Sequence, residues 1–180
     1  MFQSYFLSIS LILLVIGTPS STWGTPLKNT IKSNAIKTLP LKWKTYVGKT
    51  TYRTTLQYAY GHIFVPSNGN HWHKPRDSHD GVYILNPRNG KIMQQLVSPG
   101  LGEHDVNGVA ISNSKIVFGD DSGALTAFDW DFKPVWTYKI DADFEGAPAL
   151  MHVNDDAILD VVTGTESGTF LALNGVDGTV

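Results

Sequence analysis

From residue 56 onward the chain consists of short apolar runs separated by turns, and this pattern predicts an all-β fold. Val, Ile, Phe, Thr and Tyr fill the runs, as suits a half-buried pleated surface. In the middle of the chain the predicted strands are residues 109–112, 116–119, 125–129 and 135–140. Asn, Asp, Ser and Gly occupy the segments between them, which is typical of tight turns. No amphipathic helix is predicted after residue 40.

Three stretches of the chain resemble one another: residues 56–96, 107–140 and 146–180. The glycine before the third apolar run of each stretch is Gly81, Gly123 and Gly168, at spacings of 42 and 45 residues. A repeat of about 40–50 residues with several short strands is typical of β-propeller blades. We therefore predict a β-propeller with about three four-stranded blades within residues 41–180. A β-sandwich with Gly turns and buried Trp is the alternative.

The ends of the repeats carry a second pattern: Asp or Asn, two residues, Gly, and Trp four positions after that Gly. This pattern resembles the PQQ-like (quinoprotein-type) propeller repeat. LNPRNGKIMQ has Gln94 where Trp is usual, and FDWDFKPVW has Phe132 at the Gly position. Gly allows a tight turn, and a flat indole can cover the gap between neighbouring blades. The residues that carry the resemblance are Trp43, Gly90, Trp136 and Gly178.

Three blades are fewer than the roughly four to eight that close a propeller. The third copy, ending in LNGVDGTV, stops before its Trp position. We therefore expect the chain to be a piece of a longer product or a part of an assembly.

The first 24 residues differ from the rest and predict a secretory signal peptide. The apolar run LSISLILLVIG has 11 residues, too few to span a bilayer, and small residues follow it. Cleavage is expected before Thr25, with residues 25–40 as an extended lead-in and no membrane span afterwards. An uncleaved membrane anchor is the alternative. The predicted location is therefore periplasmic or extracellular, and the absence of cysteine excludes disulfides and thiolate metal sites.

Charge is distributed unevenly along the chain. The formal net charge of -2 argues against nucleic-acid binding. Residues 1–100 carry 11 Lys and Arg against 2 acids, whereas residues 101–180 carry 3 against 14. This asymmetry indicates either an interaction surface or two differently solvated patches of one fold.

The segment NGNHWHKPRDSHD, residues 68–80, interrupts the first repeat with a set of polar side chains. Imidazole and carboxylate groups are good ligands for zinc and related metals. The candidate metal ligands are His71, His73 and His79, with Asp77 and Asp80 beside them. A solvated polar loop is the alternative interpretation.

The segment MHVNDDAILDVV, residues 151–162, resembles the calcium loops of FG-GAP and VCBS-type propeller repeats. Asn154, Asp156 and Asp160 stand at the third, fifth and ninth positions of that pattern. His152 replaces the first carboxylate and Ala157 replaces the turn Gly. The resemblance implies a degenerate calcium loop, and an acidic β-turn is the alternative.

Two further acidic segments, GEHDVNG at residues 102–108 and DFEG at residues 143–146, precede the first strand of a repeat. Asp105, Asp143 and Glu145 could face the central channel. The alternative is that these carboxylates cap backbone N–H groups at the strand starts.

These observations predict an exported, non-catalytic β-propeller that binds a protein or surface polymer in the cell envelope or outside the cell. No known catalytic motif is present in the sequence. The PQQ-like resemblance implies one alternative, a fragment of a PQQ- and Ca²⁺-dependent quinoprotein dehydrogenase. The calcium-loop resemblance implies another, a calcium-dependent adhesin-like propeller. No cofactor is predicted, with calcium as the alternative, because the match to the quinoprotein repeat lies in structural residues and not in PQQ ligands.

Overall fold

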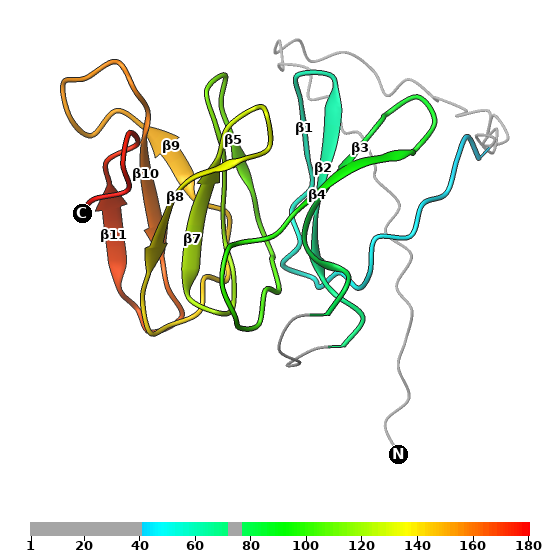
Figure 1. The fold of residues 1–180 in the computed structure, drawn as a ribbon, viewed down its shortest axis with the longest axis horizontal. Helices are drawn as coiled ribbons and strands as arrows, with labels where there is room; N and C mark the ends of the chain where they lie inside the picture. Colours follow the sequence, from blue (N-terminus) through cyan, green and yellow to red (C-terminus); the bar gives the residue numbers. More distant parts are fainter. Residues whose placement is uncertain (1–40, 72–76) are drawn as a thin grey trace, which may run out of the picture. The chain divides into compact units, whose positions relative to one another are not determined.

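The computed structural model describes residues 41–71 and 77–180 (Figure 1). These residues belong to one compact unit, which runs from residue 40 to residue 180. The predicted signal peptide and lead-in lie outside the described residues and stay predictions. Every regular element in the described part of the chain is a β-strand. No helix there is long and apolar enough to cross a bilayer.

The strands form three antiparallel sheets in which each strand pairs with its neighbours in the sequence (Figure 1). Where the connection is a tight turn, as at residues 120–123 between β6 and β7, this connectivity follows directly, because a short turn can join only adjacent antiparallel strands. The first sheet contains β1 (Gln57–Ala59), β2 (His62–Asn68), β3 (Asp80–Leu85) and β4 (Ile92–Leu96). The second contains β5 (Ala110–Ile111), β6 (Ile116–Gly119), β7 (Ala124–Phe128) and β8 (Pro134–Lys139). The third contains β9 (Ala149–Met151), β10 (Asp160–Gly164) and β11 (Phe170–Leu173).

Alternating side chains of the middle strands build two separate cores between the sheets. Ile116 and Phe118 of β6 pack in a core shared with the first sheet, together with Phe64 and Val82. Val117, between them in the sequence, packs in a core shared with the third sheet. Because successive side chains of a strand point to opposite faces, β6 covers a neighbour on each side. This accounts for the complete burial of β6 and β7. β3 is buried in the same way, because Tyr83 and Leu85 on its other face pack in a further cluster with Val47.

The first strands of the three sheets lie together. β5 contacts β1 on one side and β9 on the other. Antiparallel sheets of sequential strands that pack face to face, with their first strands adjacent, define the blades of a β-propeller. Two of the described sheets have four strands and the third has three. The predicted fold class is therefore confirmed. The strand ends in the second blade differ from the predicted ones by a residue, which is the usual uncertainty at element ends.

Candidate functional site

The segment that leads into β5 lies against the turn between β6 and β7. The backbone N–H of Asp121 donates to the carbonyl of Asp105 at 3.2 Å. The N–H of Val106 donates to the carbonyl of Ser67, near the end of β2, at 3.0 Å. Residues 103–107 are therefore fixed between two blades, and their side chains lie beside the β6–β7 turn.

A buried His–Asp contact strengthens this arrangement. His104 Nδ1 lies 2.8 Å from Asp120 Oδ2, and both side chains are almost completely buried. The other oxygen, Asp120 Oδ1, accepts hydrogen bonds from the N–H and hydroxyl of Ser122 and from the N–H of Ala124. One carboxylate thus shapes the turn and anchors the preceding segment to it. The neighbours of these two residues, at positions 103, 105 and 121, are held in place as a consequence.

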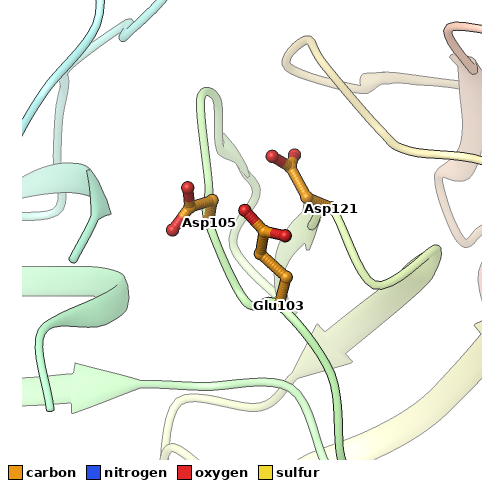
Figure 2. Close-up of side chains that lie close together, drawn as sticks. All are labelled: Glu103, Asp105 and Asp121. Atoms are coloured by element: carbon orange, nitrogen blue, oxygen red, sulfur yellow. The ribbon is translucent and has the colours of Figure 1, made fainter. Parts of the chain in front are cut away.

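Three carboxylates converge at this junction. One oxygen of each of Glu103, Asp105 and Asp121 lies within 4.8 Å of the others. Figure 2 shows the Glu103 carboxylate between those of Asp105 and Asp121. Among the described residues, these form the group of three acidic or imidazole side chains close enough together to hold a metal ion.

The surroundings of the cluster favour the protonated form of two of its members. Burial, followed by the negative charges of Asp80 and Glu103, raises the pKa of Asp105 to about 7. Burial, followed by the charges of Glu145 and Asp105, raises the pKa of Asp121 to about 8. Burial penalises a charged carboxylate, and nearby like charges penalise it further. The carboxylates of the cluster therefore repel one another, and a bound proton or cation would reduce this repulsion.

Buried acceptor oxygens around the cluster lack donors. Oδ1 of Asp105 and Oδ1 of Asp121 are buried and have no hydrogen-bond partner among the described residues. The same holds for Oδ1 of Asn68, at the end of β2. Asp105 and Asn68 are each only 3% exposed. Most buried polar groups in proteins are hydrogen-bonded, so three unpaired acceptors in one place call for an explanation.

These residues line a cavity of about 400 Å³. All three segments that precede a blade contribute to it, so the cavity lies where the blades meet. Its lining consists of Thr50, Thr51, Tyr52, Arg53, Asn68, Asp105, Asn107, Asp121 and Glu145.

A hydrogen-bonded network occupies the rim of the cavity. Asn107 Oδ1 accepts from the hydroxyl of Thr51 at 2.7 Å, and Asn107 Nδ2 donates to Glu145 Oε2 at 3.0 Å. The guanidinium of Arg53 lies 2.5 Å from the same Glu145 oxygen. This network joins the segments that precede the first, second and third blades. It presents polar groups of both charges to anything that enters the cavity.

The two acidic segments named from the sequence, residues 102–108 and 143–146, each contribute some of their carboxylates to this site. Asp105 and Glu145 line the cavity, and Glu103 and Asp121 complete the cluster. Burial and the charge of Glu166 raise the pKa of Asp143, which is not among the residues that line the cavity. Sequence reasoning missed Glu103 and Asp121. Asp121 could have been recognised from its position in the turn before the third strand, which recurs in every repeat. This turn lies beside the segment that precedes the same blade.

The predicted calcium loop, residues 152–160, joins β9 to β10. Its candidate ligands already serve as acceptors for the loop itself: Asn154 Oδ1 accepts from the N–H of Asp156 at 2.9 Å, and Asp156 Oδ1 accepts from Ile158. Both oxygens of Asp160 accept backbone N–H groups. The N–H groups of Gly175 and Val153 lower the pKa of Asp160. Calcium binding by Asn154, Asp156 and Asp160 stays a prediction.

The predicted histidine site lies only partly within the described residues, since His73 falls outside them. His71 is exposed, and its Nδ1 is 3.7 Å from Asp77 Oδ2. His79 Nδ1 lies 2.7 Å from Asn70 Nδ2, and its ring stacks on Tyr83. The backbone N–H groups of both histidines donate to Asp77, but their imidazole rings contact different groups, and joint metal binding stays a prediction.

The repeat residues pair across blade boundaries. Trp136, in β8, donates its Nε1 hydrogen to the carbonyl of Gly175 in the third blade at 3.1 Å. Trp43 donates in the same way to the carbonyl of Pro87 in the first blade at 3.0 Å. Each indole also lies over the glycine three residues after the carbonyl that it binds, which is Gly178 for Trp136 and Gly90 for Trp43. A β-carbon at either glycine would collide with the ring.

Comparison with known proteins gives likenesses of structure alone. No protein-family pattern and no curated protein sequence matches this chain. The crystal structure of BamB from Moraxella catarrhalis is similar over 71% of this chain, with 19% identity and a TM-score of 0.48. The computationally designed Ika8 protein is similar over 69%, with 13% identity and a TM-score of 0.47. The designed Ika4 protein is similar over 65%, with 16% identity and a TM-score of 0.43.

This chain covers 33% of the BamB chain, 33% of the Ika8 chain and 62% of the Ika4 chain. The class of protein, a β-propeller, therefore rests on the sheet order, the two inter-blade cores and the contacts between first strands described above.

Proposed function

We propose that this chain is an exported, non-catalytic β-propeller protein of the PQQ-like repeat type, which binds a protein or surface polymer in the cell envelope or outside the cell. One observation carries the proposal: segments preceding three successive blades converge on one polar cavity of about 400 Å³. Connecting segments held by a rigid β scaffold are common sites of binding.

The chemistry of the rim supports recognition of a polar partner. Arg53 and Glu145 present opposite charges, and their side chains retain 45% and 29% of their exposure. Tyr52, beside Arg53, is 91% exposed. Tyrosine and arginine are enriched at protein interfaces because they combine a large contact area with hydrogen-bonding groups. A partner that binds here would contact the aromatic ring at the rim and the ion pair next to it.

The 11-residue apolar run followed by small residues supports export. The Trp–Gly pairs of the repeat support the PQQ-like type, because they place the repeat residues at the blade boundaries.

Site-specific photocrosslinking in the source cells tests the binding function. A photoreactive phenylalanine analogue at position 52 should give adducts with an envelope component, and Arg53→Glu should abolish them. The same analogue at Val135, which is 55% exposed on the outer strand β8, is the matched control and should give no such adduct. Equal adducts from both positions, or none from position 52, would contradict the proposal.

A further inference from the structure

The proposed binding of a partner at the rim of the cavity does not involve the cluster of three carboxylates. We propose that Glu103, Asp105 and Asp121 form a calcium site, with the side-chain oxygen of Asn68 beside them. This site is distinct from the loop at residues 152–160, and it can be tested on the chain alone, independently of any partner.

The spacing of the oxygens suits calcium. One oxygen from each carboxylate lies within 4.8 Å of the other two. Ca²⁺–O distances of about 2.3–2.6 Å place oxygens on opposite sides of one ion at most about 5 Å apart. The corresponding limit for Mg²⁺, with its shorter bonds, is about 4 Å. The upper limit of 4.8 Å on the oxygen separations falls within the range that one calcium ion can bridge and exceeds the narrower range of magnesium, so calcium is the expected ion.

A second observation, separate from the acidic cluster, points to a ligand. Asn68 belongs to β2, in a different blade from Asp121, and is 3% exposed. Its Nδ2 donates to Asn107 Oδ1 at 3.3 Å, while its Oδ1 has no partner among the described residues. Asn68 lines the same cavity as Asp105 and Asp121, so its side chain lies beside the cluster. An amide oxygen is an ordinary calcium ligand, and a bound ion would satisfy it together with Oδ1 of Asp105 and of Asp121.

The ligands are held before any ion arrives. The Asp121 N–H to Asp105 carbonyl bond fixes the two backbones relative to each other. The buried contact between His104 and Asp120 fixes the residues next to both. Binding therefore requires little ordering of the chain, which favours affinity. It also places a divalent cation among carboxylates that otherwise repel one another.

The cavity gives the ion access and leaves coordination positions for water. Calcium takes about six to eight oxygen ligands, more than the three carboxylates and one amide supply when each offers a single oxygen. The remaining positions face the cavity, so a bound ion would present water molecules toward the rim.

Calorimetry on the full chain tests this inference. After treatment with EGTA and its removal, the wild-type protein is titrated with CaCl₂ and, separately, with MgCl₂. We expect calcium to bind with a dissociation constant between about 10⁻⁶ and 10⁻³ M, and more tightly than magnesium. Asp105→Asn and Asp121→Asn should each weaken calcium binding at least about tenfold, because each removes a formal charge from the site.

Two matched variants make the result specific. Asp131→Asn makes the same change at an exposed turn and should leave the calcium affinity unchanged. Asp156→Asn alters the other candidate loop and should also leave it unchanged. Circular dichroism in EGTA verifies that each variant is folded.

Two outcomes would overturn the inference. One is the absence of binding heat and of any melting-temperature shift in the wild-type protein up to about 10 mM calcium. The other is calcium binding that Asp156→Asn abolishes and that Asp105→Asn and Asp121→Asn leave intact. A failure of the photocrosslinking experiment would leave both measurements unaffected, so the two proposals can fail separately.

Discussion

The indole of Trp136 lies over Gly178 of the next blade, and its Nε1 hydrogen is bonded to the carbonyl of Gly175 at 3.1 Å. A β-carbon at Gly178 would lie 2.7 Å from the Cε3 atom of Trp136. Trp43 and Gly90 repeat this relationship at the first blade. Each pair joins an outer segment to the turn of the following blade, so the repeat residues stabilise the boundaries between blades.

The second blade lacks this pair. Phe132 occupies the glycine position with a φ of 64°, and Gln94 stands where the preceding blade would supply its Trp. With no indole over the turn, a side chain fits there, and Phe132 packs against the core between the first two blades. The two departures from the repeat pattern therefore compensate each other.

Gly178→Ala should destabilise the protein by about 2–3 kcal/mol, because the new methyl group meets the Trp136 ring and the φ of 74° is strained for alanine. Gly168→Ala is the matched control: its φ is 84°, but no atom lies within 4 Å of its β-carbon position. It should lose only about 1 kcal/mol through backbone strain. Urea unfolding measures both values. Equal losses would show that the indole moves aside without cost.

His104→Ala should destabilise the protein by about 3 kcal/mol, because it leaves the buried Asp120 carboxylate without its imidazole partner. His71→Ala removes an exposed imidazole that lies 3.7 Å from Asp77, and should cost less than about 0.5 kcal/mol. Urea unfolding at pH 7 compares the two. If the His104 variant were as stable as wild type, the buried contact would not anchor the segment that leads into β5.

The stability of the calcium-free protein should fall as pH rises from about 4 to about 8. In the folded chain the pKa of Asp105 is raised to about 7 and that of Asp121 to about 8, against about 4 in an unfolded chain. Within this window the folded state binds more protons than the unfolded state, so the free energy of unfolding decreases with pH. The stability that these groups contribute is fully present below about pH 4.

Urea unfolding in EGTA at several pH values measures this dependence. The double variant Asp105→Asn/Asp121→Asn should be less sensitive to pH than wild type, and more stable than wild type at pH values near 8. Identical pH profiles for the two proteins would contradict the raised pKa values.

The exported product should begin at Thr25. Expression of the full chain in a bacterial host, followed by N-terminal sequencing of the periplasmic or secreted protein, determines the cleavage point. A chain that retains Met1 and sediments with membranes would instead favour an uncleaved anchor.

Much of the blade architecture follows from local sequence. The alternation in β6 assigns Ile116 and Phe118 to one face and Val117 to the other, and the turn residues that follow make adjacent antiparallel pairing the only short connection. The repeat period near 42–45 residues then indicates blades. Each of these features depends on residues close together in the chain, which is why the sequence reveals them.

The candidate site could be predicted only in part. The position of Asp105 and Glu145 before a strand indicates that they face the channel, but their separation in the sequence does not say whether their side chains meet. Asn154, Asp156 and Asp160 match a calcium-loop pattern, yet in the structure their oxygens accept hydrogen bonds from their own loop. A spacing pattern identifies donors and acceptors, and the folded backbone decides which of them pair.

By itself, the sequence determined that this chain is all-β, that it repeats, and where glycine and tryptophan stand in each repeat, because strand periodicity and turn chemistry are local properties. Only the tertiary structure brought Asn68, Asp105 and Asp121 to one cavity. Their proximity depends on how the segment before β5 lies against the end of β2 and the β6–β7 turn. Backbone hydrogen bonds, such as that from Val106 to Ser67, set this arrangement. Burial at that junction then raises the pKa of Asp105 and of Asp121, an effect that no local pattern encodes.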